Sequence, residues 1–306
     1  MRNDSIKFGF SAWLLISIAL FMMGCSGGGG GKSSSVITNT EESAPKEVVT
    51  LSILDTYNTP GSSHTLLKDG NIIYVADGSN GLLVLEVSDS TSLKKIGSLQ
   101  ISQGQAYSLA KKGNYLYVGT SSLGVLVVDV SIPGSPSLVS SFYTTGALYY
   151  ITIEGNTLYL SSLSGFLNGF LILDISTPDA PVLKGQIQDF DVFLQAAVSN
   201  QVAYVAASDQ GLNMVFVSDP PYAKIIKKIN MGYKINVVEK YGDYLLMAGE
   251  GGGLSISDIK NVYPTSVSSL PFTNGDSQPN NQPSYQINVQ GHYAYIANGN
   301  NGVQVV

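Results

Sequence analysis

Residues 72–89 read Ile-Ile-Tyr-Val-Ala-Asp-Gly-Ser-Asn-Gly-Leu-Leu-Val-Leu-Glu-Val-Ser-Asp. Two apolar runs rich in β-branched residues are separated by a polar turn that contains glycine and asparagine, and this pattern is typical of a β-hairpin. The same pattern returns five more times along the chain. A hairpin that recurs in this way predicts a fold built from repeated β-sheets.

Two landmark positions fix the period of the repeat. The first lies in the strand before the turn and is occupied by Tyr74, Tyr117, Tyr159, Tyr204, Leu246 and Tyr295. The second is the glycine that ends the turn: Gly81, Gly124, Gly169, Gly211, Gly253 and Gly302. Successive landmarks are 42 to 49 residues apart. A period of this length, with four short strands in each unit, predicts an all-β protein, a six-bladed β-propeller of four-stranded antiparallel blades.

The first repeat shows how the four strands are expected to fall. We place them at residues 65–68, 72–76, 82–87 and 95–101, with tight turns between the first three. The strand that follows the landmark glycine is continuously apolar in several repeats, as in Val125–Val130 apart from Asp129. An unbroken apolar strand predicts burial on both faces, here between neighbouring blades.

The sequence of this apolar strand carries a family resemblance. Leu126-Val127-Val128-Asp129-Val130-Ser131 and Leu171-Ile172-Leu173-Asp174-Ile175-Ser176-Thr177-Pro178 resemble the LVIVD repeat of bacterial and archaeal surface propellers. The resemblance extends over about residues 50–306 and implies a propeller scaffold without a settled activity. The aspartate of that repeat is also present at Asp258, but the first repeat has Glu86 and the fourth has Phe216. A role that needs this aspartate in every blade is therefore not expected.

The amino terminus predicts export. Residues 1–24 carry Arg2 and Lys7 followed by an apolar run, which is typical of a secretory signal peptide. Met22-Met23-Gly24-Cys25 resembles a bacterial lipobox, which implies that Cys25, the single cysteine, carries acyl chains that anchor the protein to a membrane. Ser26 then favours the outer membrane or the cell surface. The alternative is a plain secretory signal followed by an incidental cysteine.

The remaining chain divides into a tether and a repeat domain. Residues 25–46 are rich in glycine and serine and predict a flexible tether, and residues 47–306 form the predicted propeller. The sixth repeat lacks a fourth strand, whereas residues 48–57 form one strand too many before the first repeat. We expect residues 48–57 to complete blade six, which would close the ring and complete the domain. The alternative is an extra edge strand beside a three-stranded blade six.

Composition excludes several classes of partner. The chain has 16 basic and 22 acidic residues, and removal of residues 1–24 takes away Arg2, Lys7 and Asp4, which leaves a net charge of −7. Arg2 is the single arginine, so the mature protein has none. Nucleic-acid binders need basic patches and usually arginine, and we therefore predict no nucleic-acid partner.

Metal sites and catalytic triads have little support in the sequence. The two histidines, His64 and His292, form no cluster with cysteine, so we predict no zinc or copper site and no cofactor of that kind. Bound calcium (Ca²⁺) remains a weaker alternative because the turns collect oxygen ligands, although tight turns need the same residue types. These turn residues are Asp77, Asn80, Asp209, Asn298, Asn300 and Asn301.

Two places are candidates for binding. The third repeat carries an insertion around Phe166 and Leu167, and the linker over residues 273–283 is lengthened on the same face of the propeller. The second candidate is a register of residues near the starts of the inner strands, at the mouth of the central channel, where aromatic rings could hold a sugar. Its members are His64, Tyr107, Tyr149, Leu194, Asn236 and Tyr285.

Three hypotheses for function follow. The first is a non-catalytic, lipid-anchored envelope module that binds a protein or a glycan. The second is an envelope hydrolase or lyase that acts at the channel mouth with His64 and nearby acids. The third is a purely structural component of the envelope. Because no catalytic constellation stands out, the sequence favours the first.

Overall fold

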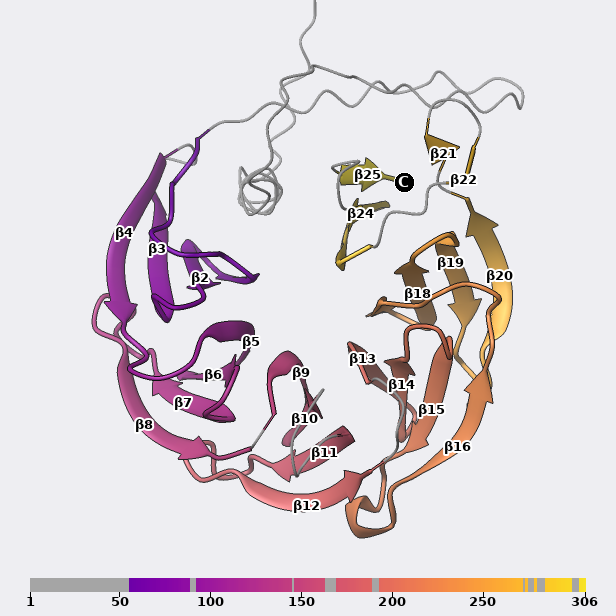
Figure 1. Cartoon of the computed structure of the whole chain (residues 1–306), viewed down its shortest axis with the longest axis horizontal. Coiled ribbons are helices and arrows are strands. Elements are labelled where there is room, and N and C mark those ends of the chain that lie inside the picture. Colours follow the sequence, from indigo (N-terminus) through magenta and orange to yellow (C-terminus); the bar gives the residue numbers. More distant parts are fainter. Residues whose placement is uncertain are drawn as a thin grey trace, which may run out of the picture.

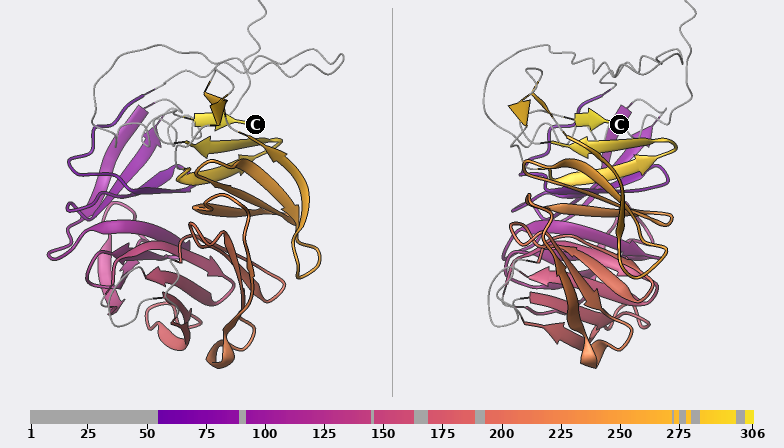
Figure 2. Two further views of the ribbon diagram at one scale, coloured as in Figure 1. Left: turned by 45° about the vertical axis from the view of Figure 1, so that its right-hand side comes forward. Right: turned by 90° about the vertical axis from the view of Figure 1, so that its right-hand side faces the viewer.

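The computed structural model shows a ring of β-sheets that follow one another in chain order (Figure 1). The turned views show the same sheets stacked around the ring (Figure 2). The structure describes residues 55–88, 92–144, 146–162, 169–188, 193–271, 273–274, 278–279, 284–298 and 303–306.

Five sheets have four antiparallel strands, ordered from the inner strand to the outer strand. Blade one contains β1 (Thr65–Asp69), β2 (Ile72–Ala76), β3 (Leu82–Ser88) and β4 (Ser92–Leu99). Blade two contains β5 (Ala106–Lys112), β6 (Tyr115–Thr120), β7 (Val125–Asp129) and β8 (Ser137–Phe142). Blade three contains β9 (Leu148–Glu154), β10 (Thr157–Ser162), β11 (Gly169–Asp174) and β12 (Val182–Ile187).

The remaining blades repeat this order. Blade four contains β13 (Ala196–Ser199), β14 (Val202–Ala206), β15 (Leu212–Phe216) and β16 (Lys224–Ile229), with the short 3-10 helix η1 (Pro220–Tyr222) before its outer strand. Blade five contains β17 (Val237–Tyr241), β18 (Tyr244–Gly249), β19 (Gly253–Asp258) and β20 (Thr265–Leu270). Blade six contains β23 (Gln286–Gln290), β24 (Tyr293–Ala297) and β25 (Val303–Val305). The predicted six-bladed propeller is confirmed.

The outer strands differ from the sequence prediction. We expected the first of them at residues 95–101, but β4 spans Ser92–Leu99. The ladder between β3 and β4 contains a β-bulge between Val84 and Leu85, and the same irregularity recurs between the third and fourth strands of blades two to five. A bulge adds an unpaired residue and breaks the period of two on which the prediction relied.

The linker between blades five and six contains a two-stranded hairpin, β21 (Thr273–Asn274) and β22 (Gln278–Pro279).

The landmark glycines occupy turns that other residues fit poorly. Each described member has a positive φ, which is +76° at Gly81, +74° at Gly124, +114° at Gly169, +82° at Gly211 and +70° at Gly253. A Cβ atom on Gly124 would also lie 2.1 Å from the carbonyl oxygen of Phe142, at the end of the outer strand. Both the backbone angle and the close approach of the outer strand therefore require glycine.

The landmark tyrosines join neighbouring blades. Tyr117 of β6 is fully buried, and its hydroxyl donates a 2.9 Å hydrogen bond to the carbonyl oxygen of Pro178 in blade three. Tyr204 of β14 makes the equivalent 2.8 Å bond to Val262 in blade five. Burial raises the pKa of Tyr117 to about 12, so its hydroxyl remains a donor over the physiological range. Each bond links a second strand to the loop before the outer strand of the next blade.

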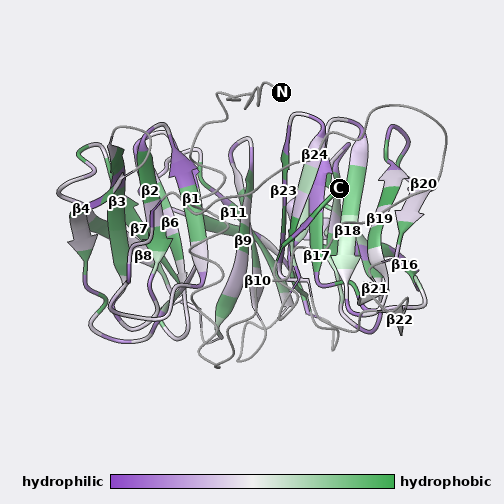
Figure 3. Ribbon diagram, turned by 90° about the horizontal axis from the view of Figure 1, so that it is seen from above, coloured by the Kyte–Doolittle hydropathy of each residue, from purple (hydrophilic) through white to green (hydrophobic). Residues whose placement is uncertain are grey.

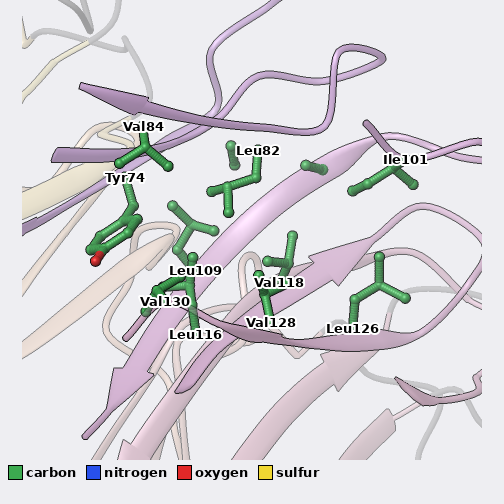
Figure 4. Packing of buried hydrophobic residues seen from close by; sticks show 12 residues of the cluster. Tyr74, Leu82, Val84, Ile101, Leu109, Leu116, Val118, Leu126, Val128 and Val130 are labelled. Atoms are coloured by element: carbon green, nitrogen blue, oxygen red, sulfur yellow. The ribbon is translucent and has the colours of Figure 1, made fainter. Parts of the chain in front are cut away.

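The hydrophobic core lies between the blades. Between blades one and two, Tyr74, Leu82 and Val84 pack with Leu109 and other apolar residues of the next sheet (Figure 4). Similar clusters lie between blades two and three, three and four, four and five, and five and six. From the side, apolar residues follow the strands, and polar residues gather in the turns at the two ends (Figure 3).

The predicted closure of blade six stays a prediction. Residues 48–54 lie outside the described residues, and the described part of blade six has three strands. The adjoining residues lie against blade one. The Asp55 carboxylate accepts a 2.7 Å hydrogen bond from the amide of Leu93, and Tyr57 packs with Leu66 and Leu93 beside the buried cluster of β2 and β3.

Candidate functional site at the starts of the inner strands

The inner strands of the six blades begin at one end of the ring, which we call the mouth face. The predicted register is seen in the backbone hydrogen bonds. The amides of His64, Leu194, Asn236 and Tyr285 each donate to a carbonyl at the end of the second strand of their own blade, at 2.8, 2.8, 3.0 and 2.9 Å; the acceptor is the last residue of the strand except in blade five, where it is the residue before the last. These residues are therefore equivalent, and they share the mouth face with the turns between second and third strands.

Blades two and three depart from this register in the same way. The ladder between β5 and β6 skips Tyr107 between Ala106 and Ser108, and the ladder between β9 and β10 skips Tyr149 between Leu148 and Tyr150. Both tyrosines are thus the extra residue of a β-bulge. Bulges redirect a side chain away from the regular alternation of a strand. Here they free two aromatic side chains, which we call the tyrosine pair, from the inter-blade core.

The tyrosine pair and His64 form a continuous aromatic cluster. The rings of Tyr107 and Tyr149 stack with centroids 4.5 Å apart and planes 21° apart. The His64 ring meets Tyr107 edge to face at 4.6 Å and 86°. Tyr149 is 39% exposed, so part of its side chain is accessible to solvent. Three consecutive blades therefore present aromatic surface to the solvent at one place.

Hydrogen bonds and burial fix the chemical state of this cluster. The Tyr107 hydroxyl donates to Oε1 of Gln105 at 3.1 Å. Burial raises the pKa of Tyr107, and the neighbouring Tyr149 contributes a smaller increase. Burial lowers the pKa of His64, and the charge of Asp77 opposes this shift only in part. The cluster is therefore uncharged at neutral pH and suits an uncharged ring rather than an anion.

Asp77 holds the chain beneath His64. Its carboxylate is fully buried and accepts hydrogen bonds from the amide of Gly61 at 3.0 Å and from the hydroxyl of Ser63 at 3.2 Å. These bonds fix the segment that leads into β1 and thereby position the His64 ring.

The other predicted members of the site lie further around the mouth face. Asn236 begins the inner strand of blade five and is half-buried, and Tyr285 begins that of blade six and is 47% exposed. Burial raises the pKa of Tyr150, which follows Tyr149 on β9.

Sequence reasoning missed one residue of the inner strands, Glu239. It lies on β17, opposite Leu246 of β18, and is half-buried. Burial raises the pKa of Glu239 from 4.5 to about 7. The sequence did mark blade five as different. It is the one blade in which a leucine, Leu246, replaces the landmark tyrosine.

The aspartate of the repeat has a local role. Asp129, Asp174 and Asp258 are each the last residue of a third strand, and each Oδ1 accepts a hydrogen bond from the amide two residues later, at 2.8, 2.8 and 2.7 Å. This geometry stabilises the loop before the outer strand. The hydrogen bond from the backbone amide of Ser131 lowers the pKa of Asp129, and the equivalent hydrogen bond from Ser176 lowers the pKa of Asp174.

Two of the turn residues named for the calcium alternative, Asp77 and Asp209, have other partners in the structure. Asp77 is bonded as described above, and Asp209 lies 3.5 Å from the ammonium group of Lys234. Within the described ranges, no group of three or more His, Cys, Asp or Glu side chains could hold a metal ion. Asn300 and Asn301 lie outside the described residues.

Several predicted features fall outside the part of the chain that the structure describes. They are the signal peptide, Cys25, the tether, and the insertion that carries Phe166 and Leu167. Among the described residues, no helix has the length and apolar character needed to cross a lipid bilayer.

The fold and the mouth face define a six-bladed β-propeller with an aromatic cluster on its inner strands. A family model described as the LVIVD repeat matches residues 60–100, 103–144, 150–189, 195–229 and 284–306. These segments cover more than half of the chain, which therefore belongs to the LVIVD repeat family. Blade five is not matched, although its four strands are present in the structure.

Comparison with other proteins adds support for the fold. No curated protein matches the sequence. Among solved structures, the chain is similar to the crystal structure of the computationally designed Ika8 protein, with a TM-score of 0.60 and 12% identity over 80% of this chain and 70% of the other. At this identity the likeness concerns the fold alone.

Proposed function

We propose that the protein is a non-catalytic binding module of the bacterial cell envelope, and that it binds a glycan at the mouth face. The tyrosine pair would stack on a sugar ring, and His64, Asn236 and Tyr285 would contact neighbouring units or hydroxyl groups. Flat apolar sugar faces pack well on aromatic rings, and the phenol and amide groups offer hydrogen bonds to hydroxyls.

One observation carries this proposal. Two neighbouring blades use the same backbone irregularity, a bulge, to present a tyrosine at the mouth face, and the two rings stack there. Tyrosines that served only inter-blade packing would follow the regular alternation, as Tyr117 and Tyr204 do. The uncharged state of the cluster favours a glycan over an anionic ligand.

The test is a binding measurement on the purified full chain in detergent micelles. A panel of immobilised oligosaccharides identifies a ligand, and titration then gives its Kd. We expect Tyr107→Ala with Tyr149→Ala to weaken binding at least about tenfold, because each aromatic contact contributes about 1 kcal/mol. Tyr222→Ala is the matched control, because this tyrosine is 74% exposed on η1, away from the mouth face.

Two outcomes would contradict glycan binding. The first is an unchanged Kd in the double variant. The second is capture of an envelope protein by the native chain when no oligosaccharide binds. Chemical breakdown of the bound glycan that is lost in His64→Ala would instead support the hydrolase or lyase hypothesis.

We also propose that the module is tethered to the outer membrane or the cell surface by acyl chains on Cys25. Support comes from the sequence of residues 1–46, in which a signal peptide, a lipobox-like segment and a flexible tether follow one another. Cys25→Ser should move the protein from the membrane fraction to the soluble fraction and abolish incorporation of a labelled fatty acid. Retention of the variant in the membrane fraction would argue against this anchor.

A further inference from the structure

We propose that the site extends from the tyrosine pair along the inner strand of blade five to Glu239, and that its ligand is a glycan carrying positively charged amines. This inference rests on the proposed function, because it names the chemical class of the glycan. Glu239 would bind an ammonium group of the ligand while the tyrosine pair stacks on another unit.

The position of Glu239 on the inner strand is the first argument. It lies three residues beyond Asn236, which is about 10 Å along an extended strand. That length suits a ligand of two or more sugar units that runs from the mouth face along the ring axis. Because β17 is the inner strand of its blade, Glu239 borders the ring axis and not the outer surface.

The second argument compares the six blades. The inner-strand residue opposite each landmark is set by the ladders, and in the other five blades it is uncharged: Leu67, Ala110, Thr152, Ala197 and Asn288. Blade five alone has a carboxylate at this position, and blade five alone has Leu246 in place of an aromatic landmark. The two exceptions therefore occur in the same cross-strand pair. The side chain opposite Glu239 is therefore a leucine, whereas the equivalent inner-strand residue of every other blade lies opposite a tyrosine.

The surroundings of Glu239 supply no counter-charge among the described residues. The side of blade five that carries Glu239 and Leu246 packs toward blade six through Val237, Ile287 and Val289. Tyr241 of β17 and Tyr244 of β18 lie on the same side, and the Tyr241 hydroxyl donates to the carbonyl of Gly291 at 3.1 Å. No described group forms an ion pair with Glu239. A half-buried, unpaired carboxylate is costly, and a cationic ligand would relieve that cost.

Titration of Glu239 gives the proposal a direct readout. Burial raises its pKa to about 7 from the ordinary 4.5, so the native fold holds the proton more tightly than the unfolded chain does. Stability should therefore fall as pH rises from about 4.5 to about 7 and change little above that range. The Tm of Glu239→Gln should lack this decline. A bound cation would hold the carboxylate ionised, so its affinity should rise with pH over the same range.

The experiment uses the full chain and three glucosamine tetramers. One is N-acetylated and neutral, one is trimethylated and keeps its positive charge at every pH, and the third is unmodified. We expect the native protein to bind the trimethylated tetramer about tenfold more tightly at pH 8 than at pH 5.5. Glu239→Gln should bind it weakly and without pH dependence. Glu154→Gln, at the exposed end of the inner strand of blade three, is the matched control and should behave as the native chain does.

The outcomes separate this inference from the proposed function. In one outcome the neutral tetramer binds the native chain and binds the Tyr107→Ala, Tyr149→Ala variant more weakly, while the cationic tetramer binds the native chain no more tightly than the neutral one does. Glycan binding then stands, and the role of Glu239 is overturned. If neither the tetramers nor the oligosaccharide panel bind, the proposed function fails first. The unmodified glucosamine tetramer, measured at pH 6.5, is a control for size. Binding of the unmodified tetramer but not of the trimethylated one would show that the trimethylated form is too large for the site. An unchanged Tm profile in Glu239→Gln would also overturn the inference.

Discussion

At the scale of the residue, a few positions require glycine for two separate reasons, the backbone angle and the lack of space for a Cβ atom. Gly124 is the clearest case, because its φ is +74° and an added Cβ would lie 2.1 Å from the Phe142 carbonyl oxygen. Gly113 also has a positive φ, +56°, but an added Cβ there meets nothing within 4 Å. The two glycines thus separate the cost of the backbone angle from the cost of the close approach.

Substitution of these two glycines gives a matched prediction. Gly113→Ala should lower the free energy of unfolding by about 1 kcal/mol, the usual cost of placing an L-residue in the left-handed region. Gly124→Ala should lower it by more than about 2 kcal/mol, because the outer strand of blade two must also move. Urea unfolding followed by circular dichroism measures both. Equal losses in the two variants would show that the close approach does not contribute.

Residue-level prediction from sequence succeeded where a repeat supplied an internal comparison. The landmark tyrosines and glycines were found because the two lie seven residues apart in five of the six repeats, and the structure places the described ones in buried strands and positive-φ turns. Glu239 was missed because a single acidic residue in Val-Val-Glu-Lys-Tyr looks like an ordinary strand residue. Its meaning emerges only when the ladder pairs it with Leu246, the exception among the landmarks.

At the scale of the element, the inner and outer strands differed in how well they could be predicted. The first three strands of blade one were placed almost correctly, because tight turns separate them and the second and third are apolar and almost fully buried. Outer strands mix exposed and half-buried residues, as in Thr265–Leu270, and each contains a bulge opposite the third strand. A bulge shifts the side-chain alternation by one residue, so the period of two ends within the strand.

The bulges in the inner strands explain what could be foreseen of the candidate site. Counting residues from the turns was enough to group His64, Tyr107 and Tyr149, because the count is the same in each blade. The stacking of Tyr107 on Tyr149 could not be foreseen, since it depends on two ladders that skip one residue each.

At the scale of the whole molecule, the ring depends on contacts between neighbouring blades. Apolar clusters connect each blade with the next one in the chain from blade one to blade six. The hydroxyl bonds of Tyr117 and Tyr204 add links from blade two to blade three and from blade four to blade five. In such an arrangement each sheet is stabilised mainly by its neighbours, as in other repeat proteins. The junction between the first and the last blade therefore has the greatest influence on the stability of the ring.

Deletion of residues 46–57 tests the predicted closure of this junction. We expect the Tm to fall by several degrees, because the change would remove a strand of blade six together with the contacts of Asp55 and Tyr57 on blade one. Deletion of residues 26–45 is the control and should leave the Tm unchanged. Asp55→Ala isolates the loss of the bond to the Leu93 amide. A Tm within a degree or two of the native value after deletion of residues 46–57 would show that closure is wrong.

The bulges at Tyr107 and Tyr149 also bear on how such a protein evolves. The bulged residue itself has no partner in the ladder. The residues on either side of it pair with the neighbouring strand, namely Ala106 and Ser108 in blade two and Leu148 and Tyr150 in blade three. Mutations at the two bulged positions therefore leave the pairing of the sheet intact. Under the proposed function, single substitutions at these positions would change ligand preference while the scaffold is inherited unchanged.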